Sequence, residues 1–572
     1  MRGPAPLRGA IMVCGTSSHA GKSLLVAGLC RALGRAGVRV APFKGQNMSL
    51  NSTVTPGGAE IGRAQWAQAV AAGAVPEAAM NPVLLKPTGE RASQVVVMGR
   101  PWATLDAAGF QQAKAELVGI VDSALADLRR RYDVVVLEGA GSPAEINLPG
   151  SDLVNLGLAA RAGVPAIVVG DIDRGGVFAH LYGTVALLPA PLRAQVRGFV
   201  INKFRGDPAL LGDGPDQLAA RCGVPTLGVL PFLEGVVLDA EDSLALLDRI
   251  GDRTGGGAWG PGGPGVPGEA AGAEVLDVAV VRFPRVSNFT DLDPLALEPG
   301  VAVRFVTGPG ALGDPDLVVL PGTKATVADL AWLRGSGLAA ALERLRRGPR
   351  PPVVLGVCGG YQMLGRRIED PAHVESDQAE VDGLGWLDVV TRFHPVKRTA
   401  QRRGTEVHGG LPVAGYEIHH GQPRPAAGAI PWFALEPDVG EGRGGNRGDG
   451  RPGADGGEGP GCDGGGDRLG RGRGDRLGRG FEEEGVRDEP AGVFGTSLHG
   501  LLECDALRGA LLAFVARRRR RSWSPSGLVF AAARRAQLDR LADACEAHLD
   551  LGGLWSIVRH GAASAPTPGG TR

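Results

Sequence analysis

Short runs of β-branched residues alternate with stretches of helical spacing between residue 9 and about residue 235. The runs are almost wholly apolar, which is typical of strands buried on both faces of a parallel sheet. The stretches between them, such as residues 23–35 and 153–162, have helical apolar spacing and end near a glycine. The expected strands are residues 11–13, 38–43, 134–137, 166–169, 199–201 and 227–230. This alternation predicts a parallel sheet with crossover helices.

A second block with the same alternation begins near residue 274. The expected strands are residues 278–281, 301–306, 317–320 and 353–357, and the expected helices are residues 326–334 and 338–346. A more β-rich region follows at residues 385–394 and 416–419, and the block closes with an apolar run at residues 493–498. The chain is therefore expected to hold two α/β domains, which agrees with its length of 572 residues.

Two segments lack any periodic apolar pattern. Residues 251–273 are rich in glycine and proline, which predicts a linker between the domains. Residues 440–480 are rich in glycine, arginine and aspartate and contain GDRLGRG twice, so they predict a disordered surface insertion. The resulting boundaries are residues 1–250 and 274–510 for the two domains and residues 511–572 for a helical tail. The spacing at residues 530–549 predicts a helix that packs on one of the two domains, and the pattern leaves open which one.

Charge and composition exclude several classes of function. The 61 basic and 61 acidic residues cancel, so the chain has no overall field that would attract nucleic acid or an anionic membrane. Because no apolar run reaches 18 residues, we expect no membrane span. The seven cysteines form no close-spaced metal or disulfide pattern, which favours a reducing cytoplasm.

The first chemical motif, GTSSHAGKS, follows the first expected strand and precedes a helix. Its residues Gly15, Thr16 and Gly21 let the backbone N–H groups and the helix N-terminus face a phosphate. Lys22 adds a positive charge for the outer phosphates, and the hydroxyl of Ser23 can ligate Mg²⁺. Five residues separate the two glycines, whereas the usual phosphate loop has four, and this spacing is similar to the variant loop of dethiobiotin synthetase. The motif predicts an ATP site.

Polar residues follow other expected strands of the same sheet. Glu138 ends the valine-rich strand at residues 134–137, where a carboxylate can hold Mg²⁺ beside the phosphate loop. Because the carboxyl ends of parallel strands meet at one edge, further polar residues there are candidates for binding an acidic substrate. These candidates are Lys44, Gln46, Asn47, Asp173 and Arg174.

The second chemical motif places a cysteine on a sharp turn. In VVLGVCGGYQML, glycines stand two residues before and two residues after Cys358, between an expected strand and an expected helix. A nucleophile on such an elbow is exposed at the top of a sheet, and the next backbone N–H, that of Gly359, can serve as an oxyanion donor. A second donor is expected from the turn at Gly322, which also follows a buried strand. Cys358 is therefore the expected nucleophile.

A nucleophilic cysteine needs a base, and three histidines are candidates. His499 ends an apolar run whose carboxyl end would lie beside the elbow, so we favour it. His419 and His420 are the competing candidates. A structural role for these histidines is the remaining alternative.

These motifs resemble a known family over most of the chain outside the linker and the insertion. The matching segments are KSLLVAGLCRAL, APFKGQNMSLNS, EIGRAQ, MNPVLLKP, EGAGSPAEINL, DIDRGGVFA, GFVINKFRGD, NFTDLDPL, GVCGGYQMLG, GYEIH and SLHG. They resemble the cobyrinate-amidating branch of the class I glutamine amidotransferases, in which the amidotransferase domain is joined to a dethiobiotin-synthetase-like ATPase domain. The resemblance implies an N-terminal P-loop NTPase-like domain and a C-terminal amidotransferase-like α/β domain.

The resemblance also implies a reaction. The enzyme would amidate the b, d, e and g carboxylates of adenosylcobyrinic acid a,c-diamide, with ATP, Mg²⁺ and glutamine as the nitrogen donor and without a tightly bound prosthetic group. Cys358 becomes the glutaminase nucleophile and His499 its base. Many class I amidotransferases have a glutamate two residues after this histidine, but the cobyrinate-amidating branch lacks it, and this chain has Leu501 there. The group that orients His499 stays open, with Glu503 and Glu417 as candidates.

Two other functions remain as alternatives. A sibling enzyme amidates the a and c carboxylates of cobyrinic acid and shares both chemical sites, although NFTDLDPL and QNMSLNS favour the first activity. A non-enzymatic nucleotide switch of the partitioning-ATPase kind is disfavoured because Cys358 and His499 are both present. The expected partner is a small corrinoid substrate, and the sequence leaves the oligomeric state open.

Overall fold

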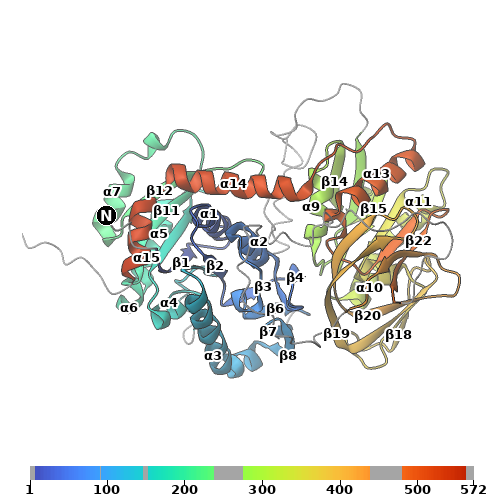
Figure 1. Ribbon diagram of the computed structural model, residues 1–572, viewed down its shortest axis with the longest axis horizontal. Coiled ribbons are helices and arrows are strands. Elements are labelled where there is room, and N and C mark those ends of the chain that lie inside the picture. The colour runs from blue at the N-terminus through green and yellow to red at the C-terminus, as the bar shows by residue number, and fades with distance from the viewer. Residues whose placement is uncertain (1–6, 90–91, 146–151, 237–274, 439–479, 562–572) are drawn as a thin grey trace, which may run out of the picture. The chain divides into compact units, whose positions relative to one another are not determined.

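The computed structural model describes residues 7–89, 92–145, 152–236, 275–438 and 480–561 (Figure 1). The expected linker at residues 251–273 lies outside the described residues, as does nearly all of the expected insertion at residues 440–480. The chain divides into two compact units. The first unit comprises Met1–Ser49, Ala59–Asp239 and Arg534–Arg572, and the second comprises Leu50–Gly58 and Ala240–Ala533.

The first unit is built on a six-stranded sheet in which every neighbouring pair is parallel. Its order is β12 (Thr226–Pro231), β11 (Val196–Phe204), β10 (Ala166–Asp171), β1 (Gly9–Gly15), β9 (Val134–Glu138) and β2 (Val40–Phe43). Helices α1 (Lys22–Arg35), α4 (Leu156–Ala162), α5 (Val177–Leu187) and α7 (Gly214–Cys222) alternate with these strands. The predicted parallel sheet with crossover helices is therefore confirmed.

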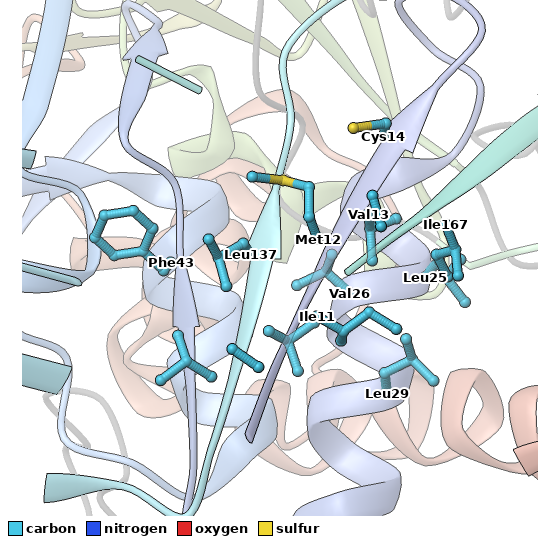
Figure 2. Close-up of a cluster of buried hydrophobic side chains, with 14 of the residues drawn as sticks. Ile11, Met12, Val13, Cys14, Leu25, Val26, Leu29, Phe43, Leu137 and Ile167 are labelled. Atoms are coloured by element: carbon cyan, nitrogen blue, oxygen red, sulfur yellow. The ribbon is translucent and has the colours of Figure 1, made fainter. Parts of the chain in front are cut away.

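Helix α1 packs its apolar side chains against the central strand β1. Figure 2 shows Leu25, Val26 and Leu29 of α1 gathered with Ile11 and Val13 of β1, and none of these five is more than 2% exposed. Burying one such side chain stabilises the fold by about 1.5–3 kcal/mol. This packing fixes both ends of the loop that joins β1 to α1.

The first unit contains elements that the sequence pattern did not indicate. A four-stranded sheet has the order β3 (Gln46–Met48), β6 (Val83–Pro87), β7 (Ala92–Val97) and β8 (Arg100–Asp106), and the long helix α3 (Ala107–Arg131) follows it. Helix α2 (Arg63–Ala72) is buried almost all round. Its side chains show no clear amphipathic stripe, which explains why periodicity did not reveal it.

The end of the described chain also packs on the first unit. Helix α14 (Phe530–His548) belongs to this unit from Arg534 onward, and α15 (Leu551–His560) follows it. A Cβ placed on Gly28 of α1 would lie 2.7 Å from the sulfur of Cys545, and Arg31 bonds to Asp539 at 2.8 Å. The choice that the sequence left open is thereby resolved in favour of the N-terminal unit.

The second unit contains an eleven-stranded mixed sheet. Its parallel part has the order β14 (Val301–Val306), β13 (Leu276–Val281), β15 (Leu317–Leu320), β16 (Val353–Val357) and β23 (Val493–Thr496). An extension follows through β22 (Glu482–Asp488), β21 (Pro431–Leu435), β19 (Val389–Glu406), β17 (Arg367–Glu369) and β18 (Glu380–Asp382), and β20 (Pro412–Pro425) pairs with β19.

The helices of the second unit match the expectation closely. α10 (Thr326–Gly335) and α11 (Leu338–Arg346) lie within one residue of the predicted helices. The short α12 (Gly359–Leu364) follows β16, and α13 (Asp505–Arg519) lies further along the chain. Among the described residues, no helix of either unit has the length and apolar character needed to cross a membrane.

Candidate active sites

The loop between β1 and α1 is held in place by two side chains from β11, which lies two strands from β1 in the sheet. The amide nitrogen of Asn202 donates to the carbonyl of Ala20 at 2.9 Å, and the ammonium of Lys203 donates to the carbonyl of His19 at 2.8 Å. Gly21 has a φ of 99°, and a Cβ there would lie 2.0 Å from the Asn202 amide nitrogen. Glycine is therefore required at this position on two counts, conformation and space.

Lys22 lies across the loop that precedes it. Its side chain is buried, and its ammonium donates to the carbonyls of Ser17 at 2.9 Å and Gly141 at 3.2 Å. A Cβ on Gly15 would lie 3.0 Å from the Lys22 side chain, so the missing side chain of Gly15 gives the lysine its path. This arrangement supplies a positive charge inside a loop that starts at a strand end and closes at a helix N-terminus, as a phosphate site requires.

Ser23 and Glu138 lie together beside the loop, as expected for a pair that shares a metal. The Ser23 hydroxyl donates to one carboxylate oxygen of Glu138 at 2.8 Å, and Lys44 donates to the same oxygen at 3.0 Å. Gln68 donates to the second oxygen at 2.6 Å. Burial opposes ionisation of Glu138, but the charge of Lys44 and the hydrogen bonds from Gln68, Lys44 and Ser23 outweigh it and lower its pKa.

This donor set fits a magnesium ion bound together with a nucleotide. Mg²⁺ prefers oxygen ligands and is usually bound by one or two protein groups plus phosphate and water. Ser23 and Glu138 provide one hydroxyl and one carboxylate. Within the described ranges, no group of three or more His, Cys, Asp or Glu side chains could hold a metal ion.

The candidate substrate residues are spread over several places. Lys44 is buried in the Glu138 cluster. Gln46 and Asn47 do not extend the edge of the six-stranded sheet. They form part of β3 in the smaller sheet, where the Asn47 amide donates to the side-chain oxygen of Gln65 at 2.8 Å.

The other two candidates, Asp173 and Arg174, lie in the loop after β10. Both are exposed, and Asp173 pairs with Arg205. The described structure brings only Lys44 into contact with Glu138.

In the second unit, Cys358 occupies the strained turn that its flanking glycines predict. Its backbone has φ 49° and ψ −108°, between β16 and α12. A Cβ on Gly360 would lie 1.9 Å from the carbonyl oxygen of Leu320, and a Cβ on Gly356 would lie 2.8 Å from the backbone nitrogen of Tyr361. A non-glycine residue in this region of φ and ψ is costly and is typical of nucleophile elbows.

His499 lies beside Cys358, shortly after the end of β23. The imidazole is buried, and the Cys358 side chain lies near enough to raise its pKa. Its Nδ1 lies 2.7 Å from a carboxylate oxygen of Asp291, and the other oxygen of Asp291 accepts from the backbone N–H of Gly500 at 2.8 Å. The three residues form a chain in which a carboxylate orients an imidazole that contacts a thiol.

The surroundings of His499 favour the protonated imidazole. Burial lowers the pKa, but the negative charges of Asp291 and Cys358 and their hydrogen bonds outweigh it and raise the pKa to about 10. At neutral pH, His499 is therefore an imidazolium that can stabilise a thiolate and donate a proton.

The structure selects a partner for His499 that the sequence analysis did not consider. Asp291 lies in the short 3₁₀ helix Phe289–Leu292, within the NFTDLDPL segment, 208 residues before His499. Glu417, one of the two expected candidates, instead pairs with Arg398 and Arg402. The other candidate, Glu503, lies on the 3₁₀ helix Leu501–Glu503, and neither glutamate makes the contact to Nδ1 that Asp291 makes.

The competing histidines lie elsewhere in the unit. His419 lies 3.6 Å from Glu417 on β20, and Nδ1 of His420 lies 3.0 Å from the carbonyl oxygen of His394. Of the three candidate bases, His499 is the one that contacts both Cys358 and Asp291.

The turn at Gly322 lies against both members of the thiol site. A Cβ on Gly322 would lie 2.9 Å from Cε1 of His499, and a Cβ on Gly359 would lie 3.1 Å from the backbone nitrogen of Thr323. Gly322, Cys358 and His499 follow the carboxyl ends of the neighbouring strands β15, β16 and β23 by one to three residues. The site is therefore built from the carboxyl ends of three adjacent parallel strands.

Comparison with known families matches both units. The model described as the CobQ/CobB/MinD/ParA nucleotide binding domain matches residues 11–245. The model described as the CobB/CobQ-like glutamine amidotransferase domain matches residues 277–456. The phosphate loop lies in the first match and Cys358 lies in the second, which confirms the predicted fold class.

Similar proteins extend over nearly the whole chain. Proteins named cobyric acid synthase from Frankia casuarinae and Nocardia farcinica are 49% and 50% identical, and each alignment covers 97% of this chain and 98% of the relative. A solved structure titled "Crystal structure of glutamine amidotransferase" aligns with 42% of this chain and 98% of its own at 17% identity and a TM-score of 0.27. The full-length likeness and the two domain matches show that the chain belongs to the cobyric acid synthase family of glutamine amidotransferases.

Proposed function

We propose that this chain converts the b, d, e and g carboxylates of adenosylcobyrinic acid a,c-diamide into amides, using ATP and glutamine, and so forms cobyric acid. The observation that carries the proposal is the Asp291–His499–Cys358 arrangement in a chain that also holds a phosphate loop. Relatives named cobyric acid synthase support the choice of substrate. The proposal includes a cytoplasmic location and no tightly bound prosthetic group.

The second unit would release ammonia from glutamine. The Cys358 thiolate attacks the side-chain amide carbon, and His499 donates its proton to the departing ammonia. Water then attacks the thioester with His499 as the base, which releases glutamate and regenerates the thiol. Asp291 keeps the imidazole oriented and stabilises its positive charge, while the N–H groups of Gly359 and Gly322 serve as donors to the oxyanion.

The first unit would activate the acceptor carboxylate. The γ-phosphoryl group of ATP passes to a carboxylate oxygen, which yields ADP and an acyl phosphate; ammonia then attacks the acyl carbon and phosphate leaves. Lys22 and the loop N–H groups, with Gly15, Thr16 and Gly21 shaping the loop, would stabilise charge on the transferred group. Ser23 and Glu138 would hold Mg²⁺, which when bound neutralises phosphate charge.

The remaining candidates would bind the acidic substrate. Lys44 is a buried cation already next to Glu138, and Arg174 is an exposed cation after β10. Both can pair with a carboxylate of the corrinoid. Gln46, Asn47 and Asp173 complete this proposed set as hydrogen-bonding groups.

The test is incubation of the purified chain with adenosylcobyrinic acid a,c-diamide, glutamine and MgATP, followed by mass analysis. We expect four successive amidations and one ADP for each amide formed. A parallel reaction with cobyrinic acid tests the sibling activity at the a and c positions. Amidation of cobyrinic acid with no change in the diamide would replace the proposed substrate with the sibling's.

A further inference from the structure

One short segment belongs to a different unit from the chain on either side of it. Leu50–Gly58 groups with the second unit, whereas the residues before and after it belong to the first. The segment begins three residues after Asn47, which with Lys44 and Gln46 is one of the proposed substrate residues. The backbone N–H of Ser49 still donates to the carbonyl of Leu85 in β6 at 3.0 Å. The chain therefore passes from the first unit to the second between the adjacent residues Ser49 and Leu50.

The start of this segment is clamped by Asn288, a residue of the NFTDLDPL motif. The Asn288 N–H donates to the carbonyl of Leu50 at 3.4 Å, and its side-chain oxygen accepts from the N–H of Ser52 at 3.3 Å. Asn288 has a φ of 51°, a left-handed conformation that asparagine tolerates better than most residues. Thr290 adds a third bond by donating to the side-chain oxygen of Asn51 at 3.0 Å.

Tyr416 joins the same segment to the imidazole of His499. Its hydroxyl donates to the carbonyl of Ser52 at 3.1 Å and accepts from the Asn288 amide at 3.1 Å. Its ring stacks on His499 with centroids 5.4 Å apart and an interplanar angle of 25°. The two backbones also exchange hydrogen bonds, because each N–H donates to the other residue's carbonyl at 2.9–3.0 Å.

The segment therefore reaches His499 by two routes. One passes through the hydroxyl and ring of Tyr416 to the face of the imidazole. The other passes through Asn288 and Thr290 to Asp291, which binds Nδ1 of the imidazole at 2.7 Å. Residues that contact Leu50–Ser52 therefore hold both the ring of His499, through Tyr416, and the carboxylate that orients it, that of Asp291.

We propose that Leu50–Gly58 is a coupling segment and that Tyr416 and Asn288 are positioning residues that make the glutaminase base respond to the acceptor site. An acidic substrate held at Lys44–Asn47 restrains the chain that leads into the segment, and the restrained segment holds Tyr416, Asn288 and Thr290 so that His499 is aligned with Cys358. Without that restraint, the imidazole is less well aligned and glutamine hydrolysis is slower. This inference rests on the proposed glutaminase role of Cys358 and His499.

The test uses the full chain and measures glutamate release with and without the a,c-diamide corrinoid and MgATP. Tyr416→Phe removes the two hydroxyl hydrogen bonds but keeps the ring stack. We expect the acceptor to stimulate glutamate release by the wild type. In the variant, the rate of glutamate release with the acceptor present should be about tenfold lower than in the wild type, as the loss of one or two hydrogen bonds predicts. The KM for glutamine and the rate of amidation with free ammonia should not change.

Matched variants separate positioning from general damage. Tyr132→Phe removes a hydroxyl bond to Glu77 in the first unit and should leave the stimulation unchanged. Thr290→Val, which removes the hydroxyl bond to Asn51, should show part of the loss of stimulation. Thr290→Ser, which keeps the hydroxyl, should be stimulated as the wild type is. Because Tyr416 and Asn288 share one network, Tyr416→Phe combined with Asn288→Ala should cost less than the product of the single losses.

The possible outcomes distinguish this inference from the proposed function. No glutaminase activity in the wild type would contradict the proposed function itself. A wild type that hydrolyses glutamine equally fast with and without the acceptor, or a Tyr416→Phe variant with full stimulation, would overturn the coupling segment alone. A tenfold loss of stimulated rate in Tyr416→Phe, with part of that loss in Thr290→Val and none in Thr290→Ser, supports the coupling segment.

Discussion

The phosphate loop and the thiol site both lie where parallel strands end, yet they are assembled in different ways. The phosphate loop is one uninterrupted segment between β1 and α1, and distant residues such as Asn202 and Lys203 only brace its carbonyls. The thiol site brings Asp291, Cys358 and His499 together from three separate segments, and the carboxylate and the imidazole are 208 positions apart in the sequence.

This difference indicates how each site should respond to damage. The loop keeps its backbone conformation from its own glycines and from the packing of α1 on β1, so losing a brace should weaken nucleotide binding without abolishing it. The thiol site depends on long-range contacts for the orientation of its base, so losing one contact should lower the rate of chemistry.

The largest expected effect is the loss of glutaminase activity in Cys358→Ser. A serine hydroxyl is a far weaker nucleophile than a thiolate, so glutamate release should fall by at least about 10⁴-fold. Amidation with free ammonia and ATP should remain near the wild-type rate. Cys222→Ser is the matched control because Cys222 is only half-buried and lies on α7 of the other unit. If Cys358→Ser also failed with ammonia, the two units would not divide the reaction as proposed.

Asp291→Asn should have the next largest effect, a loss of about 10³-fold in glutaminase kcat. The amide cannot stabilise the imidazolium, so the pKa of His499 should fall from about 10, since Asp291 is the strongest influence raising it. As the imidazolium is the proton donor, the alkaline decline of kcat/KM should shift to lower pH in the variant. Glu503→Gln is the matched control, and an unchanged pH profile in Asp291→Asn would contradict the orienting role.

Lys22→Met should lower ATP-dependent amidation by about 10²-fold with either nitrogen source, because it removes a charge that stabilises the transferred phosphoryl group. Glutamate release without the acceptor should be unaffected. Coupled ADP and amide assays report both rates. Equal loss of both activities would show that Lys22 supports the fold of the whole chain instead.

Asn202→Ala should raise the KM for ATP about tenfold and change kcat little, because it removes a brace of the loop and leaves Lys22 and Ser23 in place. Initial-rate measurements over a range of ATP concentrations give both constants. A collapse of kcat with unchanged KM would show that the loop depends on distant contacts as strongly as the thiol site does.

The smallest expected effect concerns the stability of the strand that leads to His499. Burial raises the pKa of Glu484 to about 7 despite hydrogen bonds from Ser497 and Thr496. The pKa of Glu484 is higher in the folded protein than in the unfolded chain. The neutral carboxyl therefore contributes its full stabilisation below about pH 4.5, and this contribution disappears as the pH rises through about 7. Glu484→Gln should therefore increase the free energy of unfolding by about 1–2 kcal/mol at pH 8 and much less at pH 5.

Urea unfolding at the two pH values measures this difference. Glu483→Gln, which changes an exposed neighbour on the same strand, is the control. If both variants responded to pH in the same way, the shielded environment of Glu484 would not be the cause.

The phosphate loop and the elbow could be predicted from the sequence because each is formed by adjacent residues. GTSSHAGKS and GVCGGYQ each carry the strand end, the glycines and the functional side chain in one stretch. The parallel strands were equally visible, because strands buried on both faces are continuous apolar runs. Cys358 and His499 could be paired because both follow such runs.

The residues that the sequence did not reveal act at a distance. Asp291 lies in NFTDLDPL, which was recognised only as a family motif, and nothing local indicates which of its polar residues faces His499. Tyr416 and Asn288 acquire their roles only through contact with Leu50–Ser52, far away in the sequence. Helix α2 was missed because burial on almost all sides removes the amphipathic pattern.

The most direct measurement follows nitrogen from donor to product. The wild-type chain is given adenosylcobyrinic acid a,c-diamide, MgATP and glutamine labelled with heavy nitrogen in its side-chain amide, and the corrinoid is analysed by mass spectrometry. The account predicts four labelled amides, and none in Cys358→Ser unless ammonia is added. A folded wild-type protein that hydrolyses glutamine and ATP but returns the diamide unlabelled would contradict it.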